Sequence, residues 1–107
     1  PYPVAFIRDS AGVPRCSCGG IVKPDVVLYE EGLDADVLSG AIHAIQQADM
    51  LIIGGTSLVV YPAAGLINYY NGHKLVLINK SATGMDSRAD LAIHAPIGEV
   101  FSQITVD

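Results

Sequence analysis

Short apolar runs alternate with segments of helical periodicity from residue 26 onward. The runs that predict strands are residues 26–29, 50–53, 74–78 and 91–94. The segments that predict helices are residues 35–47, 62–70 and 98–104. Strands that alternate with helices form parallel βαβ units with right-handed crossovers. The sequence therefore predicts an α/β fold built on a parallel sheet with flanking helices.

Two of the helical segments carry their own start signals. Asp34 precedes the first one, and its carboxylate can accept hydrogen bonds from the free amides of the first turn. Pro62 suits the first position of the second helix, because the N–H that proline lacks has no partner there. Asn71 and Gly72 end that helix.

The composition limits the classes of function. The net charge is -5 and no basic run occurs, so we expect no nucleic-acid partner. No apolar run reaches the roughly 20 residues of a membrane span, and the first residues do not resemble a signal peptide. We therefore expect a cytoplasmic protein without a membrane partner.

The chain is apolar for a small domain. Half of its 107 residues are hydrophobic and only 16% are charged. This balance suits strands that are buried in a parallel sheet, and it also suits a piece of a larger protein whose other part would cover the excess. Exposed apolar surface of this kind makes self-association possible.

Ligands of open parallel sheets bind outside the carboxyl ends of the strands. That rule selects three places, which are residues 54–57, Asn79 with Lys80, and the turn around residues 96–98. Glycine there permits close approach of a ligand, and hydroxyl or amide side chains could bond ribose or phosphate oxygens. Taken alone, residues 54–57 and Asn79 are explained more often by ordinary turns, and no G-x-G-x-x-G opens the helix after residues 54–57.

The metal-ligating and titratable residues form no complete site by spacing. Cys16 and Cys18 could give two thiolates to zinc, which needs four ligands, and the C-x-C spacing is poor for a disulfide. His43, His73 and His94 have no ligand spacing to the cysteines and no nucleophile beside them. Glu30 and Glu31 fit solvated loop charges better than an acid–base pair.

Four blocks of this sequence resemble, in the same order, segments of the sirtuin family. They are GIVKPDVVLYEEGL at 20–33, GTSLVVYPA at 55–63, IN at 78–79, and AD followed by GEV between 89 and 100. The similarity extends from about residue 13 to residue 104. It implies the C-terminal part of a Rossmann-like sheet over residues 26–107 and the remnant of a small zinc-binding module over residues 1–25.

The resemblance also implies site residues. Sirtuins are NAD-dependent protein-lysine deacylases, and the positions carried over for the adenosine side of NAD are Gly55, Thr56, Ser57, Asn79, Lys80 and Ile97. An acylated-lysine peptide would lie in a cleft flanked by Val27, Leu28, Tyr29, Glu31, Val59 and Val60. Cys16 and Cys18 would be half of the family's zinc site.

The chemistry of the family needs residues that this sequence does not contain. In that reaction the acyl oxygen attacks the anomeric carbon of NAD while nicotinamide leaves, so the enzymes are also ADP-ribosyl transferases. The phosphate loop, the catalytic histidine and the first zinc cysteine pair precede the matched region. Within it, the family's F-G-E is Tyr29, Glu30 and Glu31. We therefore expect no deacylase activity from this chain alone.

Three alternatives remain open at this stage. A non-catalytic nucleotide-binding or regulatory module with a Rossmann-like fold would explain the missing motifs. The central domain of a thiamine-diphosphate enzyme has a similar architecture, but it does not require C-x-C followed by KPDVVLY. The third alternative is an interaction protein that associates with itself through apolar surface.

Overall fold

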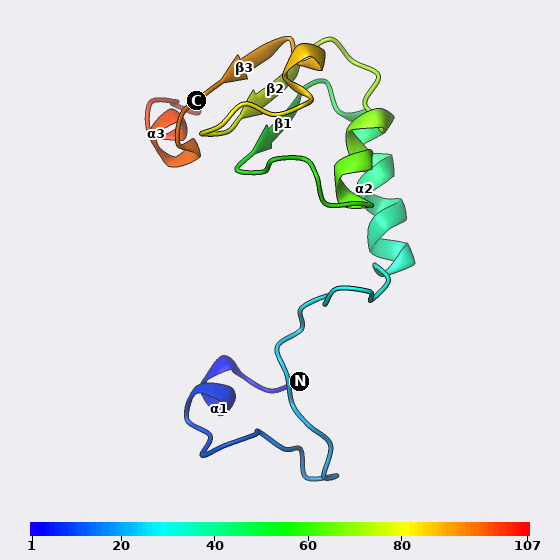
Figure 1. Cartoon of the computed structure of the whole chain (residues 1–107), viewed down its shortest axis with the longest axis vertical. Coiled ribbons are helices and arrows are strands. Elements are labelled where there is room, and N and C mark those ends of the chain that lie inside the picture. Colours follow the sequence, from blue (N-terminus) through cyan, green and yellow to red (C-terminus); the bar gives the residue numbers. More distant parts are fainter. The chain divides into compact units, whose positions relative to one another are not determined.

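The computed structural model describes residues 1–107 as two compact units, Pro1–Leu33 and Asp34–Asp107 (Figure 1). The first unit contains one short helix, α1 (Val4–Arg8), and an isolated antiparallel bridge between Arg15 and Ile21. The second unit contains all the strands and the other helices. The sequence predicts no helix here, because residues 1–25 contain four prolines and three glycines.

The second unit is built on a three-stranded parallel sheet in the order β1-β2-β3. The strands are β1 (Leu51–Gly54), β2 (Leu75–Ile78) and β3 (Leu91–Ile93). Each lies within one residue of its predicted start and end. The predicted α/β fold with a parallel sheet is thus confirmed.

Helix α2 (Ala35–Gln47) has the predicted bounds. The carboxylate of Asp34 accepts hydrogen bonds from the backbone N–H of Asp36 at 2.9 Å and of Val37 at 3.0 Å. These bonds satisfy two of the amides that have no partner in the first turn.

The other helices differ in detail from the prediction. The segment η1 (Ala63–Tyr69) is a 3₁₀ helix, and Pro62 lies at its N-cap rather than inside it. Gly65 N–H bonds to the carbonyl of Pro62, three residues earlier, as this tighter helix requires. Helix α3 (Ile97–Phe101) begins one residue early and ends three residues early, and the short η2 (Asp86–Arg88) was not predicted.

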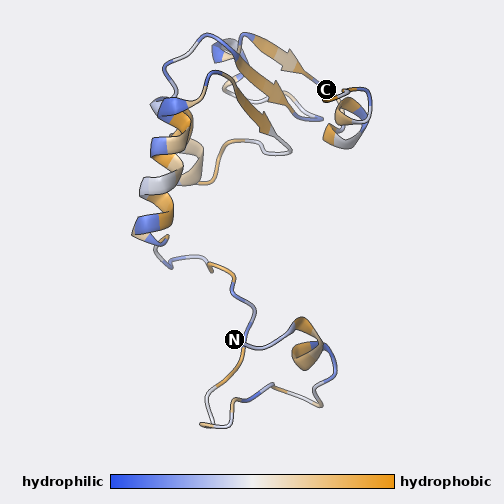
Figure 2. Ribbon diagram, turned by 180° about the vertical axis from the view of Figure 1, so that it is seen from behind, coloured by the Kyte–Doolittle hydropathy of each residue, from blue (hydrophilic) through white to orange (hydrophobic).

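The core of the chain is small and is drawn from the central strand and η1. Leu75, Leu77 and Ile78 of β2 are buried, as are Ala64 and Ile67, which lie three residues apart on η1. Figure 2 shows the strands as mainly hydrophobic ribbon. The hydroxyl of Tyr70 closes one end of this layer, because it donates to the Asp49 carbonyl and accepts from Lys74 N–H, each at 3.0 Å.

The predicted strand over residues 26–29 is wrong. Its backbone pairs with no neighbouring strand. Instead, Glu31 N–H bonds to the Leu28 carbonyl at 3.2 Å, and the Glu31 carboxylate accepts from Leu28 N–H at 2.8 Å. Glu30 has a positive φ of 70°. The β-branched run therefore leads into a turn, since strand propensity without a neighbouring strand forms no ladder.

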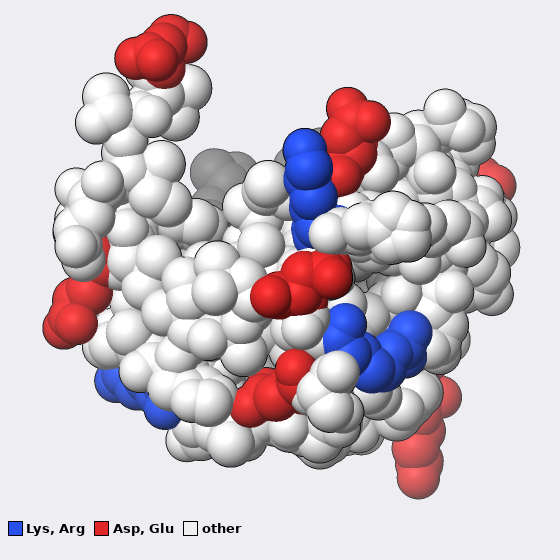
Figure 3. Space-filling view, turned by 90° about the horizontal axis from the view of Figure 1, so that it is seen from above, with Lys and Arg blue, Asp and Glu red and all other residues white.

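The surface carries much exposed hydrophobic area. Twenty large hydrophobic side chains are exposed, including Tyr29 at 94% and Val59 at 70%. On the face drawn in Figure 3, the Lys and Arg side chains lie scattered among acidic and uncharged ones. No helix in the chain combines the length and the apolar character that crossing a bilayer would demand.

Candidate functional site

The carboxyl ends of the three strands lie level with one another. Gly54 pairs with Ile78, which in turn pairs with Ile93. Two backbone hydrogen bonds continue this alignment past the strands: Gly55 N–H to the Ile78 carbonyl at 2.9 Å, and Asn79 N–H to the Ile93 carbonyl at 3.1 Å. The three connections selected from the sequence therefore begin side by side along one edge of the sheet.

The connection after β1 exposes its backbone. Gly55 has a φ of 69°, a conformation that favours glycine, and nothing lies within 4 Å of the position that a Cβ would take. Leu58 also has a positive φ, 57°, and its N–H bonds to the Thr56 hydroxyl at 3.2 Å. Thr56 thus holds the turn by accepting a hydrogen bond, while Thr56 and Ser57 remain exposed.

Thr56 also lines an apolar cavity of about 210 Å³ on the side of β1 that faces η1. The side chains around it come from α2, β1, η1 and the connection after β1, and they include Ile45, Ile53, Val60 and Ile67. Of the predicted peptide-side residues, Val60 lies here and Val59 is exposed beside it in the sequence.

The first residue of α3 lies directly over the end of β1. A Cβ on Gly54 would overlap Cδ1 of Ile97 and lie 3.3 Å from its Cγ1. Glycine at position 54 is therefore what allows the start of α3 to approach the strand end. The structure thus brings Ile97 against Gly54, the residue before Gly55.

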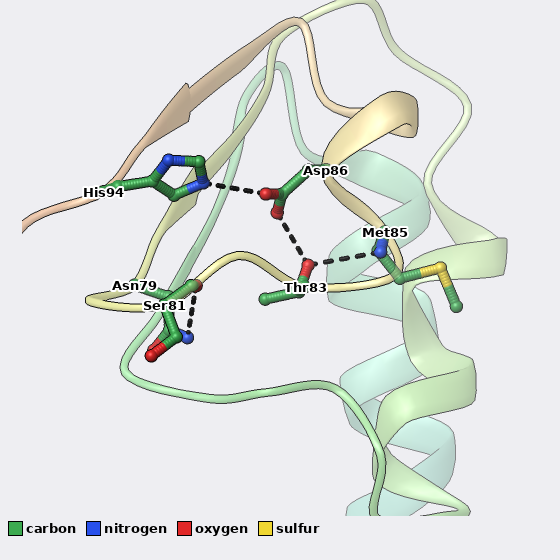
Figure 4. Close-up of polar contacts among 6 residues, drawn as sticks. All are labelled: Asn79, Ser81, Thr83, Met85, Asp86 and His94. Carbon is green, nitrogen blue, oxygen red and sulfur yellow. Dashed lines mark hydrogen bonds and ion pairs between the residues drawn. The ribbon is translucent and has the colours of Figure 1, made fainter.

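The connection after β2 begins with Asn79 and Lys80. The Asn79 side-chain amide donates to the Ser81 carbonyl at 3.0 Å, which fixes the carboxamide near the strand end (Figure 4). Lys80 is exposed. Both residues lie at the same sheet edge as the other predicted adenosine-side residues.

A polar cluster that the sequence analysis missed lies beside them. The Thr83 hydroxyl donates to Asp86 Oδ1 at 2.7 Å, and His94 Nε2 lies 2.8 Å from Asp86 Oδ2 (Figure 4). The pKa of Asp86 is below its ordinary value, first because of the Thr83 hydroxyl and then because of His94. The available signal was the T-x-x-D spacing of Thr83 and Asp86, which is typical of local capping.

The predicted peptide-side residues of the first unit are accessible. Val27, Leu28 and Tyr29 are all more than half exposed, and Glu31 forms the turn with Leu28 described above. The N–H and carbonyl of Leu28 are both used in that turn, whereas the main-chain groups of Val27 and Tyr29 bond to no other residue and remain open to a partner chain.

The two cysteines lie on a tight turn. Cys16 N–H bonds to the Gly20 carbonyl at 2.8 Å, and the Cys16 carbonyl accepts from Gly19 N–H at 2.9 Å. Both thiols are free, and no group of three or more His, Cys, Asp or Glu side chains in the chain could hold a metal ion. Because zinc takes four protein ligands in a structural site, Cys16 and Cys18 alone do not complete one.

The profile of the Sir2 family matches residues 5–62, which is 58 of the 107 residues. The chain belongs to the Sir2 family. This membership excludes the alternative of a thiamine-diphosphate enzyme domain.

Curated Sir2 relatives cover nearly the whole chain. An NAD-dependent protein deacetylase of Clostridium perfringens (strain 13 / Type A) is 67% identical over 96% of the chain and 43% of its own length. One of Clostridium acetobutylicum is 60% identical over 92% of the chain and 40% of its own length. The chain thus spans about two fifths of the length of these relatives.

Solved Sir2 structures have the same fold as this chain. A structure described as Sir2 with a p53 peptide and NAD⁺ matches with a TM-score of 0.78 at 34% identity, over 94% of this chain and 43% of that one. A structure described as Sir2 bound to acetylated peptide matches with a TM-score of 0.77 at 35% identity, over 90% of this chain and 42% of that one.

Proposed function

We propose that this chain is the part of an NAD-dependent protein-lysine deacetylase that holds the adenosine side of NAD and part of the acyl-lysine peptide cleft. The observation that carries the proposal is the level sheet edge, where Gly55 and Asn79 follow aligned strand ends and Ile97 lies against Gly54. Membership in the Sir2 family and the deacetylase relatives support it.

The residues at this edge have the groups that an adenosine diphosphate needs. The open backbone at Gly55 lets a ligand come close, and the hydroxyls of Thr56 and Ser57 can donate to its oxygens. Because the Asn79 amide nitrogen is held by Ser81, its carbonyl oxygen is directed as an acceptor for a ribose hydroxyl. Lys80 adds a positive charge, and Ile97 offers an apolar contact to the adenine ring.

NAD, when bound to the complete site, supplies the anomeric carbon that the acyl oxygen attacks as nicotinamide departs. The chain's own residues bind and orient the distant end of that cofactor, which is a contribution of positioning. None of its 107 residues corresponds to the family's general base. We therefore propose that the chain by itself does not deacylate lysine.

Each unit has exposed residues that we propose, for that unit by itself, as contacts of an acyl-lysine peptide. Val27, with Leu28, Tyr29 and Glu31, would add its main chain to an extended acyl-lysine peptide. Val59 and Val60 would do the same from the second unit. Glu30, which has a positive φ, stands where the family has glycine, so the turn geometry is kept by a residue that carries charge.

We also propose the division of the chain into domains and its cellular location. Residues 1–25 would be a small zinc-binding module, in which Cys16 and Cys18 give two of four zinc ligands, and residues 26–107 would be the NAD-binding domain. A cytoplasmic location is proposed as well, because the spacing of Cys16 and Cys18, one residue apart, is poor for a structural disulfide.

Nucleotide titrations followed by NMR test the main proposal. NAD and ADP-ribose should perturb the backbone amides of Gly55, Thr56, Asn79 and Ile97, whereas nicotinamide mononucleotide, which lacks adenosine, should not. Perturbations confined to other residues would contradict the assigned site. A deacetylation assay with the chain, NAD and an acetylated peptide should show no turnover, and measurable turnover would refute the proposed division of roles.

A further inference from the structure

The connection between β2 and β3 is attached to the end of β3 at two points. Its first residue, Asn79, donates its backbone N–H to the Ile93 carbonyl at 3.1 Å. Seven residues later, Asp86 Oδ2 meets His94 Nε2 at 2.8 Å. Because Ile93 and His94 are consecutive, residues 79–86 form a loop whose two ends are fixed to one place on the sheet.

Asp86 is held in the orientation that this attachment needs. Its other carboxylate oxygen accepts from the Thr83 hydroxyl at 2.7 Å, and its N–H bonds to the Thr83 carbonyl at 3.2 Å. The Thr83 hydroxyl in turn accepts from Met85 N–H at 3.2 Å. Both carboxylate oxygens are thus used, and Figure 4 shows the imidazole of His94 directed at Asp86 from the end of β3.

The two attachments are formed by different kinds of group. The bond from Asn79 continues the sheet ladder and depends on backbone alone. The bond between Asp86 and His94 depends on two side chains, which are 22% and 50% exposed. Without it, residues 80–85 would lose their direct link to the end of β3. Asn79 would keep its backbone bond and its contact with Ser81, and the far end of the loop would be held only further along the chain, where Arg88 bonds to Asn68 at 2.6 Å and Asp90 bonds to Leu75.

We infer that Asp86 and His94 are positioning residues for the recognition of an adenosine diphosphate, which they serve by closing the loop that carries Asn79 and Lys80. The inference rests on the proposed function of the sheet edge. Neither side chain touches the nucleotide in this scheme; they act through the loop. The ligand class is a purine nucleoside diphosphate, whose ribose would meet the carboxamide of Asn79.

Calorimetric titration of ADP-ribose into the full chain and its variants tests this role. His94→Ala and Asp86→Ala should each weaken ADP-ribose binding roughly tenfold, the order of effect of losing one hydrogen bond that orders a binding group. His94→Gln, whose carboxamide N–H can still reach Asp86, should recover affinity. His73→Ala, at an exposed histidine outside this loop, is the matched control and should bind as the unaltered chain does.

The NMR signal of the Asn79 side-chain amide gives a readout that a general loss of stability would not move. It should shift in His94→Ala without ligand and return toward its original position in His94→Gln. Asp86→Asn, which keeps an oxygen for Thr83, provides the same test should His94→Ala not fold.

The outcomes separate the two proposals. ADP-ribose affinity in folded His94→Ala and Asp86→Asn equal to that of the unaltered chain overturns the positioning role and leaves the proposed function standing. Absence of ADP-ribose binding by the unaltered chain overturns both.

Discussion

Ile97 Cδ1 occupies the space that a side chain on Gly54 would fill, so the first residue of α3 packs directly on the last residue of β1. This contact joins two of the three connections at the carboxyl edge of the sheet. It makes position 54 a place where one added methyl group has a defined consequence.

Gly54→Ala should destabilise the chain by about 1–3 kcal/mol, because the new Cβ overlaps Ile97 and forces α3 to move. Chemical denaturation followed by circular dichroism measures the change. Gly98→Ala is the matched control, since a Cβ at Gly98 meets open space and the position lies in the same helix. Equal stability of the two variants would show that the packing of Ile97 on Gly54 does not matter.

Asp34→Ala should cost about 1 kcal/mol of stability, because the amides of Asp36 and Val37 lose their acceptor. Asp34→Ser keeps an oxygen at the N-cap and should restore most of the loss. Urea unfolding of the unaltered chain and the two variants, compared with the same dependence of free energy on urea concentration, gives the free energies of unfolding. If Asp34→Ser is as unstable as Asp34→Ala, capping is not the cause.

Tyr70→Phe should destabilise the second unit by about 1 kcal/mol, since the hydroxyl bridges the Asp49 carbonyl and Lys74 N–H. Its neighbour Tyr69 is 42% exposed and makes no such bridge, so Tyr69→Phe is the control. In thermal melts, Tyr70→Phe should have a lower melting temperature than Tyr69→Phe. The reverse order would contradict the bridging role of the Tyr70 hydroxyl.

The helix and strand pattern of the second unit could be predicted because local chemistry and tertiary structure agree there. Asp34 marks the start of α2, and the apolar runs of β1 and β2 lie in the sheet core or at its edge. The strand predicted over residues 26–29 was wrong for the opposite reason. Their β-branched composition favours a strand, but the outcome depends on a neighbouring strand, which local sequence does not encode.

The candidate site could be predicted only at the level of which connections meet. The strand-end rule selected Asn79 and the residues around Gly55, and the structure aligns them. The link between Asp86 and His94 could not be predicted, because it joins residues of two elements whose separation is set by the sheet register.

The stability of the chain should depend on the ionisation of Asp86 at acid pH. Its pKa in the folded chain lies below the ordinary value of 3.8, so its stabilising contribution is complete above that pH and is lost as the pH falls through the depressed folded value. Asp86→Asn should therefore be less stable than the unaltered chain at neutral pH, with the gap closing below about pH 4. Denaturant midpoints of both proteins, measured from neutral pH to below about pH 4, test this expectation. A stability difference that widens toward acid would contradict the stabilising role of the ionised Asp86.

The exposed apolar surface should make the chain associate with itself. β1 is an edge strand of the sheet, and Ile52 on it is 45% exposed. Light scattering should show a mass that increases with concentration, and Ile52→Lys should reduce that increase because a charge on an edge strand opposes pairing. Val37→Lys, at an exposed site on α2, is the control. A monomer at every concentration would contradict the expectation.

The alignment of Gly54, Ile78 and Ile93 in one register has a consequence for engineering. Each connection leaves the sheet at the same height, so lengthening any one of them moves it into the space of the other two. When the connections after β1, β2 and β3 are lengthened one at a time, a smaller fraction of variants should therefore fold than when all three are changed together.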